Sequence, residues 1–158
     1  PTVKRTPVLL DVAVCLPKEA QTVSLIRSVV RHALGTFGVS PDCVDDICLA
    51  LSEACNNVVD HAVPDDEYEV RLQVDDARCI ISVRNTGEGF DAEALADVMP
   101  NPRSPRGRGV AIMHAVMDQV DFLSEPEAGT IVRLVKVLAA EPGGPLERLR
   151  RQGTAAPD

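Results

Sequence analysis

The sequence predicts an α+β protein, a two-layer α/β sandwich with helices on one face of a β-sheet. Helix-type and strand-type segments occur in separate runs along the chain, which is typical of such a sandwich. Short turns between consecutive strands, such as Asp75-Asp76, indicate antiparallel pairing. A length of 158 residues suits one domain with a single core.

The charge and the composition of the chain argue against several functional classes. The net charge of −8 and the isoelectric point near 4.8 oppose direct binding of nucleic acid, which needs a broad basic surface. No apolar run reaches the length of a membrane span and no signal peptide is visible, so we expect a cytoplasmic protein. Aromatic residues make up only 3% of the chain, which predicts an aliphatic core.

The five cysteines form neither a Cys-x-x-Cys pair nor a zinc-ligand pattern. We interpret them as reduced, mostly buried thiols that pack as small hydrophobic residues. A redox role is the less favoured alternative.

The sequence divides into a predicted domain over residues 8–138, a flexible start over residues 1–7 and a disordered tail over residues 139–158. The tail contains Pro, Gly and Arg but no apolar period. Strands are predicted over residues 8–16, 68–74, 78–83, 118–124 and 130–138. Helices are predicted over residues 19–34, 41–62, 91–99 and 109–117. Three prolines predict an irregular, mobile loop over residues 100–106.

The chain is organised around one predicted helix segment, DDICLALSEACNNVVDHA, over residues 45–62. Its apolar residues recur on one helical face, at Ile47, Leu51, Cys55, Val58 and Ala62. On another face, Glu53 and Asn57 lie one turn apart. Asn is a weak helix former, so the pair Asn56 and Asn57 indicates that an amide has a role here. A solvated polar face is the alternative.

Two glycine-containing segments follow this helix. Asn85-Thr86-Gly87-Glu88-Gly89 ends a predicted strand, and Arg106-Gly107-Arg108-Gly109 opens a predicted helix. In this order, with SEACNNVVDHA before them and GTIVRL after them, they resemble the GHKL ATP-binding superfamily, and more narrowly its anti-sigma-factor, serine-protein-kinase branch. The resemblance covers residues 8–138 and implies a Bergerat-type, histidine-kinase-like ATPase fold with a mixed, mostly antiparallel sheet.

The resemblance implies that the central helix carries the metal and the catalytic base. The matching asparagine of the family links Mg²⁺ to the triphosphate, and Asn57 takes this role because it lies four residues after Glu53, with Asn56 as the competitor. An amide oxygen is a suitable hard ligand for Mg²⁺. Glu53 matches the general base, a carboxylate that accepts the proton of an attacking hydroxyl.

The resemblance also implies an adenine site at the end of a strand. The family pattern is Asp-x-Gly-x-Gly, and its Asp accepts a hydrogen bond from the adenine amino group. Here Asn85 replaces the Asp, so the amide oxygen still accepts but the bond is no longer charge-assisted. Gly87 and Gly89 let the backbone pass close to the base, and Thr130 matches a threonine that helps to fix adenine. An ordinary turn and an ordinary strand residue are the alternatives.

The phosphate site is implied where Gly107 and Gly109 open a helix. Backbone amides and the positive end of a helix favour phosphate, and Arg103, Arg106 and Arg108 add positive charge. The proline-rich loop before them resembles a lid, although a solvated surface loop is the alternative.

We therefore expect a protein serine/threonine kinase that acts as an anti-sigma factor. It is expected to bind ATP and Mg²⁺, to sequester a sigma factor and to phosphorylate a STAS-type anti-sigma-factor antagonist on serine. We expect a homodimer without direct contacts to nucleic acid or membrane. The alternative is a non-catalytic, weakly ATP-binding module that only binds its sigma factor or antagonist. An ATPase without a transcription partner is less favoured.

Overall fold

The structure, a computed structural model, describes residues 7–60, 66–85, 105–125 and 129–154. Its elements are β1 (Val8–Pro17), α1 (Ala20–Thr36), α2 (Pro41–Val59), β2 (Glu67–Asp75), β3 (Arg78–Asn85), α4 (Pro105–Val116), β4 (Gln119–Glu125), β5 (Gly129–Val137) and α5 (Pro145–Thr154). The described strands form one sheet in the order β1-β2-β3-β5-β4.

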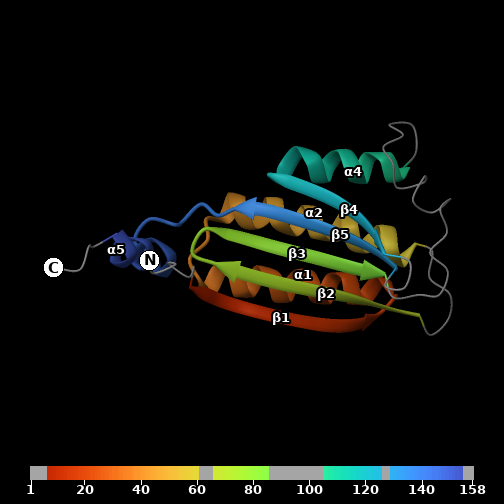
Figure 1. The fold of residues 1–158 in the computed structure, drawn as a ribbon, viewed down its shortest axis with the longest axis horizontal. Helices are drawn as coiled ribbons and strands as arrows, with labels where there is room; N and C mark the ends of the chain where they lie inside the picture. Colours follow the sequence, from red (N-terminus) through yellow and green to blue (C-terminus); the bar gives the residue numbers. More distant parts are fainter. Residues whose placement is uncertain (1–6, 61–65, 86–104, 126–128, 155–158) are drawn as a thin grey trace.

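The predicted two-layer α+β sandwich is confirmed. Figure 1 shows α1 and α2 over one face of the sheet, with α4 beside α2 and β4. Each neighbouring pair of described strands is antiparallel, where the resemblance implied a mixed, mostly antiparallel sheet.

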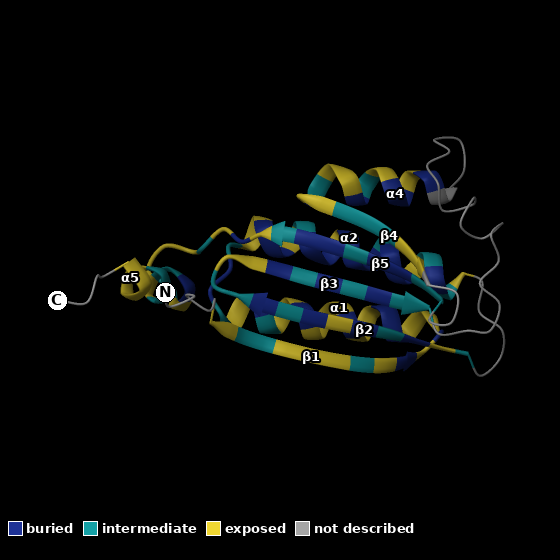
Figure 2. Cartoon of the chain, in the orientation of Figure 1, coloured by how far each residue is buried: buried dark blue, intermediate teal, exposed yellow. Residues whose placement is uncertain are grey.

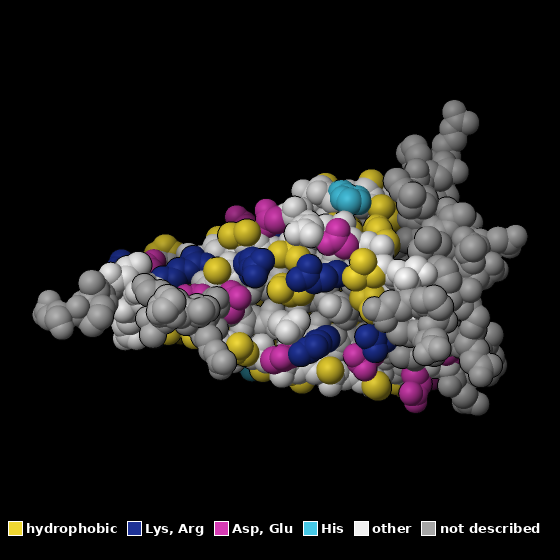
Figure 3. Space-filling model, in the orientation of Figure 1, with side chains coloured by type: hydrophobic (Ala, Val, Ile, Leu, Met, Phe, Trp, Pro, Cys, Tyr) yellow, Lys and Arg dark blue, Asp and Glu magenta, His cyan; other side chains and the backbone are white. Residues whose placement is uncertain are grey.

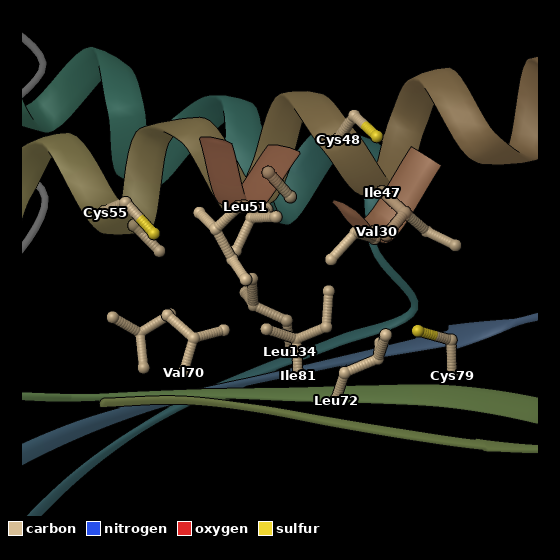
Figure 4. Close-up of a cluster of buried hydrophobic side chains, with 14 of the residues drawn as sticks. Val30, Ile47, Cys48, Leu51, Cys55, Val70, Leu72, Cys79, Ile81 and Leu134 are labelled. Carbon is tan, nitrogen blue, oxygen red and sulfur yellow. The ribbon is translucent and has the colours of Figure 1, made fainter. Parts of the chain in front are cut away.

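The core lies between the helices and the sheet and is mainly aliphatic, as the composition predicts, with the fully buried Tyr68 as an aromatic member. Along β2, alternate side chains are buried on the helix side, namely Tyr68, Val70, Leu72 and Val74. Figure 2 shows the same alternation of buried and more exposed residues along the strands. In Figure 4, Ile81 of β3 and Leu134 of β5 extend from the sheet toward α2. Burying each such side chain contributes roughly 1.5–3 kcal/mol.

Helix α2 covers the sheet with the apolar face that its periodicity predicts. Ile47, Leu51, Cys55 and Val58 are buried, whereas Ala62 lies outside the described residues. Figure 4 shows Leu51 and Cys55 pointing to the sheet. None of the described helices is long and apolar enough to cross a membrane.

The cysteines pack as small hydrophobic residues, which confirms that part of the interpretation. All five are free thiols, and every one except Cys15 is buried. Burial raises the pKa of Cys55 and of Cys79 to about 12, so both thiols keep their protons at neutral pH.

The opposite face of the sheet carries no helix among the described residues, and Figure 3 shows this face in front. Basic and hydrophobic side chains lie next to one another there. The strand register places Arg71, Ile80, Arg133 and Val135 on this face. Arg71 donates hydrogen bonds to the Asp11 carboxylate at 2.9 and 3.0 Å. This open face therefore combines apolar contact area with charges of both signs.

Helix α4 begins earlier than the sequence predicts. It starts at Pro105, so Pro105 and Arg106 belong to the helix rather than to the predicted loop. Proline suits the first helical position, because the N–H that it lacks has no helical partner there. The rest of that loop and the helix predicted over residues 91–99 lie outside the described residues.

Lys136 of β5 holds the far end of α4 in place. Its Nζ donates hydrogen bonds to the carbonyl oxygen of Val116, the last residue of α4, at 2.5 Å and to Asp46 Oδ2 of α2 at 3.2 Å. A cation at the C-terminal end of a helix also interacts favourably with the helix dipole. The ends of α4, α2 and β5 are thereby joined.

The expectation of a disordered tail is wrong for residues 145–154, which form α5. Leu146 is 1% exposed and anchors this helix. Arg150 donates to the carbonyl of Asp76 at 2.7 Å and to the carbonyl of Leu138 at 2.8 Å. Pattern analysis missed α5 because a single buried leucine produces no apolar period.

Replacing Leu146 with Ala is expected to lower the free energy of unfolding by about 2–4 kcal/mol, as for other buried leucines. Chemical denaturation measures this loss. Leu25→Ala on the exposed face of α1 is the matched control, with an expected change of about 0.5 kcal/mol or less. Equal effects of the two substitutions would mean that α5 does not dock.

Candidate functional site

The predicted site residues that the structure describes lie at one end of the sandwich, on the right in Figure 1. At this end α2 and β3 finish, while α4 and β5 begin. The residues come from four elements: Glu53 and Asn57 from α2, Asn85 from β3, Arg106, Gly107, Arg108 and Gly109 from α4, and Thr130 from β5. Gly87 and Gly89 lie outside the described residues.

The backbone of α4 packs directly against the polar face of α2 at Gly109. A Cβ atom added to Gly109 would lie 2.7 Å from Glu53 Oε2 and 3.7 Å from Asn57 Oδ1. The first of these distances is too short for a real contact, so a side chain at position 109 would displace the Glu53 carboxylate, which is the far end of a flexible side chain. The face on which the sequence placed Glu53 and Asn57 therefore meets the start of α4.

Gly109→Ala is expected to leave the protein about 1 kcal/mol less stable than a matched Gly→Ala control, because the added methyl group displaces the Glu53 carboxylate from its place against α4. Thermal denaturation measures this effect. The control is Gly35→Ala in α1, where an added Cβ would have no neighbour within 4 Å. This control is expected to be neutral or stabilising, by up to about 1 kcal/mol. A Gly109→Ala variant as stable as the Gly35→Ala control would contradict the close packing.

Asn57 has a buried hydrogen-bond donor without a partner in the described part of the chain. Its Nδ2 is buried and has no hydrogen-bond partner among the described residues. A buried donor that makes no hydrogen bond lowers the free energy of unfolding by roughly 1–3 kcal/mol, and native structures contain few such donors. The neighbouring Asn56 is exposed, whereas Asn57 Oδ1 lies near Gly109. Between the two asparagines, the geometry favours Asn57 as the one that meets a ligand.

On the sheet, Asn85 and Thr130 are opposite each other in the pairing of β3 with β5. Asn85 Oδ1 accepts a hydrogen bond from Lys18 Nζ at 2.6 Å, and the same Nζ lies 2.5 Å from Asp66 Oδ2. Gly129 has a φ of +82°, and a Cβ atom added there would collide with the carbonyl oxygen of Asn85. Glycine therefore permits both the backbone conformation and the close contact between the strands.

Lys18 is the candidate that pattern analysis missed. Its side chain is only 3% exposed, in the turn between β1 and α1. Thr22 Oγ1 holds this turn, at 2.7 Å from the Pro17 carbonyl oxygen and 2.8 Å from that of Glu19. The Tyr68 hydroxyl lies 3.0 Å from the same Oγ1. A single lysine in a turn has no period or spacing that marks it, so its partners are known only from the fold.

Tyr68 connects the site residues of the sheet with those of α2. It is fully buried and opposite Asn85 in the pairing of β2 with β3. Burial raises its pKa to about 12, and Cys55 of α2 is a neighbour that also affects this pKa. Because Cys55 lies two residues before Asn57, this contact brings the end of α2 to the same end of the sheet as Asn85.

The start of α4 supplies the positive end of a helix. Gly107 and Gly109 are buried in its first turns and Arg108 is exposed, while the side chain of Arg106 lies outside the described part of the chain. The first turn of an α-helix favours an anion through its backbone N–H groups and its dipole. This positive end is close to the Glu53 and Asn57 side chains, since a Cβ atom added to Gly109 would lie within 4 Å of both.

Asn57 offers the donor chemistry that suits a Mg²⁺ ion held mainly by a nucleotide. Within the described ranges, no three His, Cys, Asp or Glu side chains are grouped as metal ligands. Mg²⁺ commonly takes one or two protein oxygens and completes its octahedron with phosphate and water oxygens. Asn57 Oδ1, next to an amide donor that has no partner among the described residues, has the chemistry of such a ligand.

The chain is similar in sequence to one family and to a group of curated proteins. The family described as Histidine kinase-like ATPase domain matches residues 16–136. Serine-protein kinase RsbW from Bacillus velezensis is 30% identical over 137 residues, which cover 80% of this chain and 84% of the relative. Serine-protein kinase RsbW from Bacillus subtilis is 28% identical over 137 residues, with the same 80% and 84% coverage.

Two solved structures share the fold. The RsbU and RsbW domains of a Mycobacterium tuberculosis protein match with a TM-score of 0.61 and 17% identity, over 84% of this chain and 34% of that one. The SiaB-SiaC complex from Pseudomonas aeruginosa matches with a TM-score of 0.60 and 15% identity, over 82% of this chain and 89% of that one. At these identities the likeness concerns the fold alone.

Proposed function

The chain belongs to the histidine kinase-like ATPase family, in its anti-sigma-factor and serine-protein-kinase branch, and on this basis we propose that it is an anti-sigma factor with serine kinase activity. It binds ATP with Mg²⁺, sequesters a sigma factor and phosphorylates an anti-sigma-factor antagonist on serine. The main support is the placement of Glu53 and the unsatisfied Asn57 amide against the start of α4.

Asn57 is the metal residue of this proposal. Its Oδ1 would hold Mg²⁺, and its Nδ2 would donate to a phosphate oxygen of the nucleotide. Ligand binding then satisfies a donor that has no described partner in the protein alone. When bound, Mg²⁺ offsets the negative charge of the phosphates.

Glu53 is the general base. Its carboxylate takes the proton of the substrate serine hydroxyl while the serine oxygen bonds to the γ-phosphorus of ATP. The bond from that phosphorus to the β,γ-bridging oxygen breaks, and ADP leaves. Glu53 is half-buried, and Gly109 holds the start of α4 next to its carboxylate.

The remaining site residues are assigned either to the adenine base or to the phosphates of ATP. Base recognition is assigned to Asn85, Gly87, Gly89 and Thr130. Phosphate binding is assigned to Arg106, Gly107, Arg108 and Gly109. The position of Asn85 opposite Thr130 supports the first group, and the positive end of α4 supports the second.

The partners follow from the same proposal. A sigma factor and a STAS-type antagonist bind the protein in the cytoplasm, where transcription takes place, and the protein itself contacts neither nucleic acid nor membrane. The protein acts as a homodimer. The open face of the sheet supports self-association, because the exposed apolar side chains of Leu123 and Val137 lie there.

A non-catalytic partner-binding module is the alternative function. The observation in its favour is the state of Asn85, whose oxygen already accepts a hydrogen bond from Lys18. A weaker adenine contact lowers affinity for ATP without changing any surface that binds a protein.

The experiment is transfer of radiolabelled γ-phosphate to purified STAS-type antagonists, beside a binding titration with candidate sigma factors. The proposal predicts a phosphoserine on the cognate antagonist and a complex with one sigma factor. Sigma-factor binding without phosphate transfer to any antagonist would favour the non-catalytic module.

A further inference from the structure

A buried ion pair lies beside Asn85, the residue assigned to recognition of the adenine base. Lys18 has a side chain 3% exposed and Asp66 one 14% exposed, and their charged atoms are 2.5 Å apart. Burial of a charge is costly unless it is paired and hydrogen-bonded. The second partner of the Lys18 ammonium is Asn85 Oδ1, at 2.6 Å. A cation therefore lies within hydrogen-bonding distance of the side chain proposed to read the base.

This cation is held from several sides. The backbone N–H of Lys18 donates to the Asp66 carbonyl oxygen at 3.0 Å, so the backbones are joined as well as the side chains. Thr22 and Tyr68 fix the turn that contains Lys18. Asp66 is also held in place, since its Oδ1 accepts a hydrogen bond from the N–H of Glu67 at 3.0 Å. The position of the ammonium is thus a built feature of the fold rather than one conformation of a mobile side chain.

The ammonium also fixes which atom of Asn85 is the oxygen. A lysine ammonium has N–H donors and no acceptor, so the Asn85 atom facing it is Oδ1. An adenine amino group that hydrogen-bonds to this oxygen is itself a donor and has to share the oxygen with a cation. A purine with oxygen at C6 presents an acceptor instead, which a neighbouring positive charge favours.

We propose that Lys18 is a specificity-determining residue that weakens the preference of the site for adenine and admits purines with oxygen at C6. This inference rests on the proposed function, which places the base at Asn85. It adds that the absence of the family Asp and the presence of Lys18 act together. Asn85 and Lys18 form one recognition unit, and Asp66 is the counter-ion that allows the unit to be buried.

The test measures the affinities of Mg-ATP and Mg-ITP by calorimetry, because the two bases differ at the C6 edge. In the site variant, Lys18→Met and Asp66→Asn together remove both charges, so that no buried carboxylate is left alone. The matched control applies the same changes, Lys136→Met and Asp46→Asn, to another Lys–Asp pair. That pair is at the other end of β5 from Thr130, on the order of 20 Å along the strand.

The parent is expected to bind ATP and ITP with affinities within about threefold of each other. The site variant is expected to shift this ratio toward ATP by about tenfold, the scale of one altered polar contact, and the control pair to leave it unchanged. The single variant Lys18→Arg keeps the cation and is expected to keep the parental ratio of the two affinities.

An unchanged ratio in the site variant, or a shift toward ITP, would overturn the inference while leaving the proposed function intact. Absence of binding by both nucleotides to the folded parent would instead overturn the proposed function, and the inference with it. A ratio rather than a single affinity is used because a loss of stability affects both nucleotides alike.

Discussion

A Glu53→Gln variant is expected to transfer phosphate to serine roughly a hundredfold or more slowly than the parent, while it binds Mg-ATP with similar affinity. Gln preserves the size of the side chain and its contact with Gly109, but it does not accept the serine proton. A general base acts on the transition state and is not needed to hold ATP in the ground state. Initial rates of radiolabel transfer, beside calorimetric titration of Mg-ATP, measure the two quantities separately.

The matched control for this variant is Glu141→Gln, an exposed residue that lies outside the proposed site. The control is expected to transfer phosphate at the parental rate. If Glu53→Gln transfers as fast as this control, Glu53 has no part in the mechanism. If Glu53→Gln also loses Mg-ATP binding, its role is to shape the site around Gly109 rather than to move a proton.

Replacing Asn57 with Leu is expected to act in opposite directions on the free and the ATP-bound protein. In the free protein it removes a buried donor that has no partner among the described residues, so stability is expected to rise by about 1 kcal/mol. Mg-ATP should then give no stabilisation, although the parent gains roughly 2.7 kcal/mol at a ligand concentration one hundred times the Kd. Melting temperatures measured with and without Mg-ATP test both parts.

Asn56→Leu is the control for this prediction, because Asn56 is the exposed neighbour on the same helix. We expect it to keep the full Mg-ATP effect and to change the stability of the free protein little. Retention of the Mg-ATP effect by Asn57→Leu, or its loss in Asn56→Leu, would show that Asn57 is not the residue that holds the metal.

The parts of the fold that depend on local periodicity could be predicted from the sequence. The buried positions Ile47, Leu51 and Cys55 follow from one helical period, and the alternation along β2 from a strand period. The pairing of Glu53 with Asn57 follows in the same way, since both lie on one turn. Local patterns were sufficient for one helix and for its polar face.

Long-range contacts could not be predicted from such patterns. The approach of Gly109 to Glu53 joins two helices that are far apart in the chain, and the contact of Lys18 with Asn85 spans 67 residues. The start of α4 at Pro105 was missed because three prolines in a short stretch indicate a loop, although the last of them suits the first turn of a helix. α5 was missed because it is held mainly by Leu146 and Arg150, which form no pattern along the chain.

The most direct test of a nucleotide site at this end of the sheet is an NMR titration that follows the asparagine side-chain amides as Mg-ATP is added. The account predicts that the Nδ2 signals of Asn57 and Asn85 shift on binding, while that of the exposed Asn56 stays in place. Removal of Mg²⁺ by a chelator should return the Asn57 signal to its starting position. An Asn57 signal that does not move at saturating Mg-ATP would contradict the assignment of the metal and the triphosphate to this end of the fold.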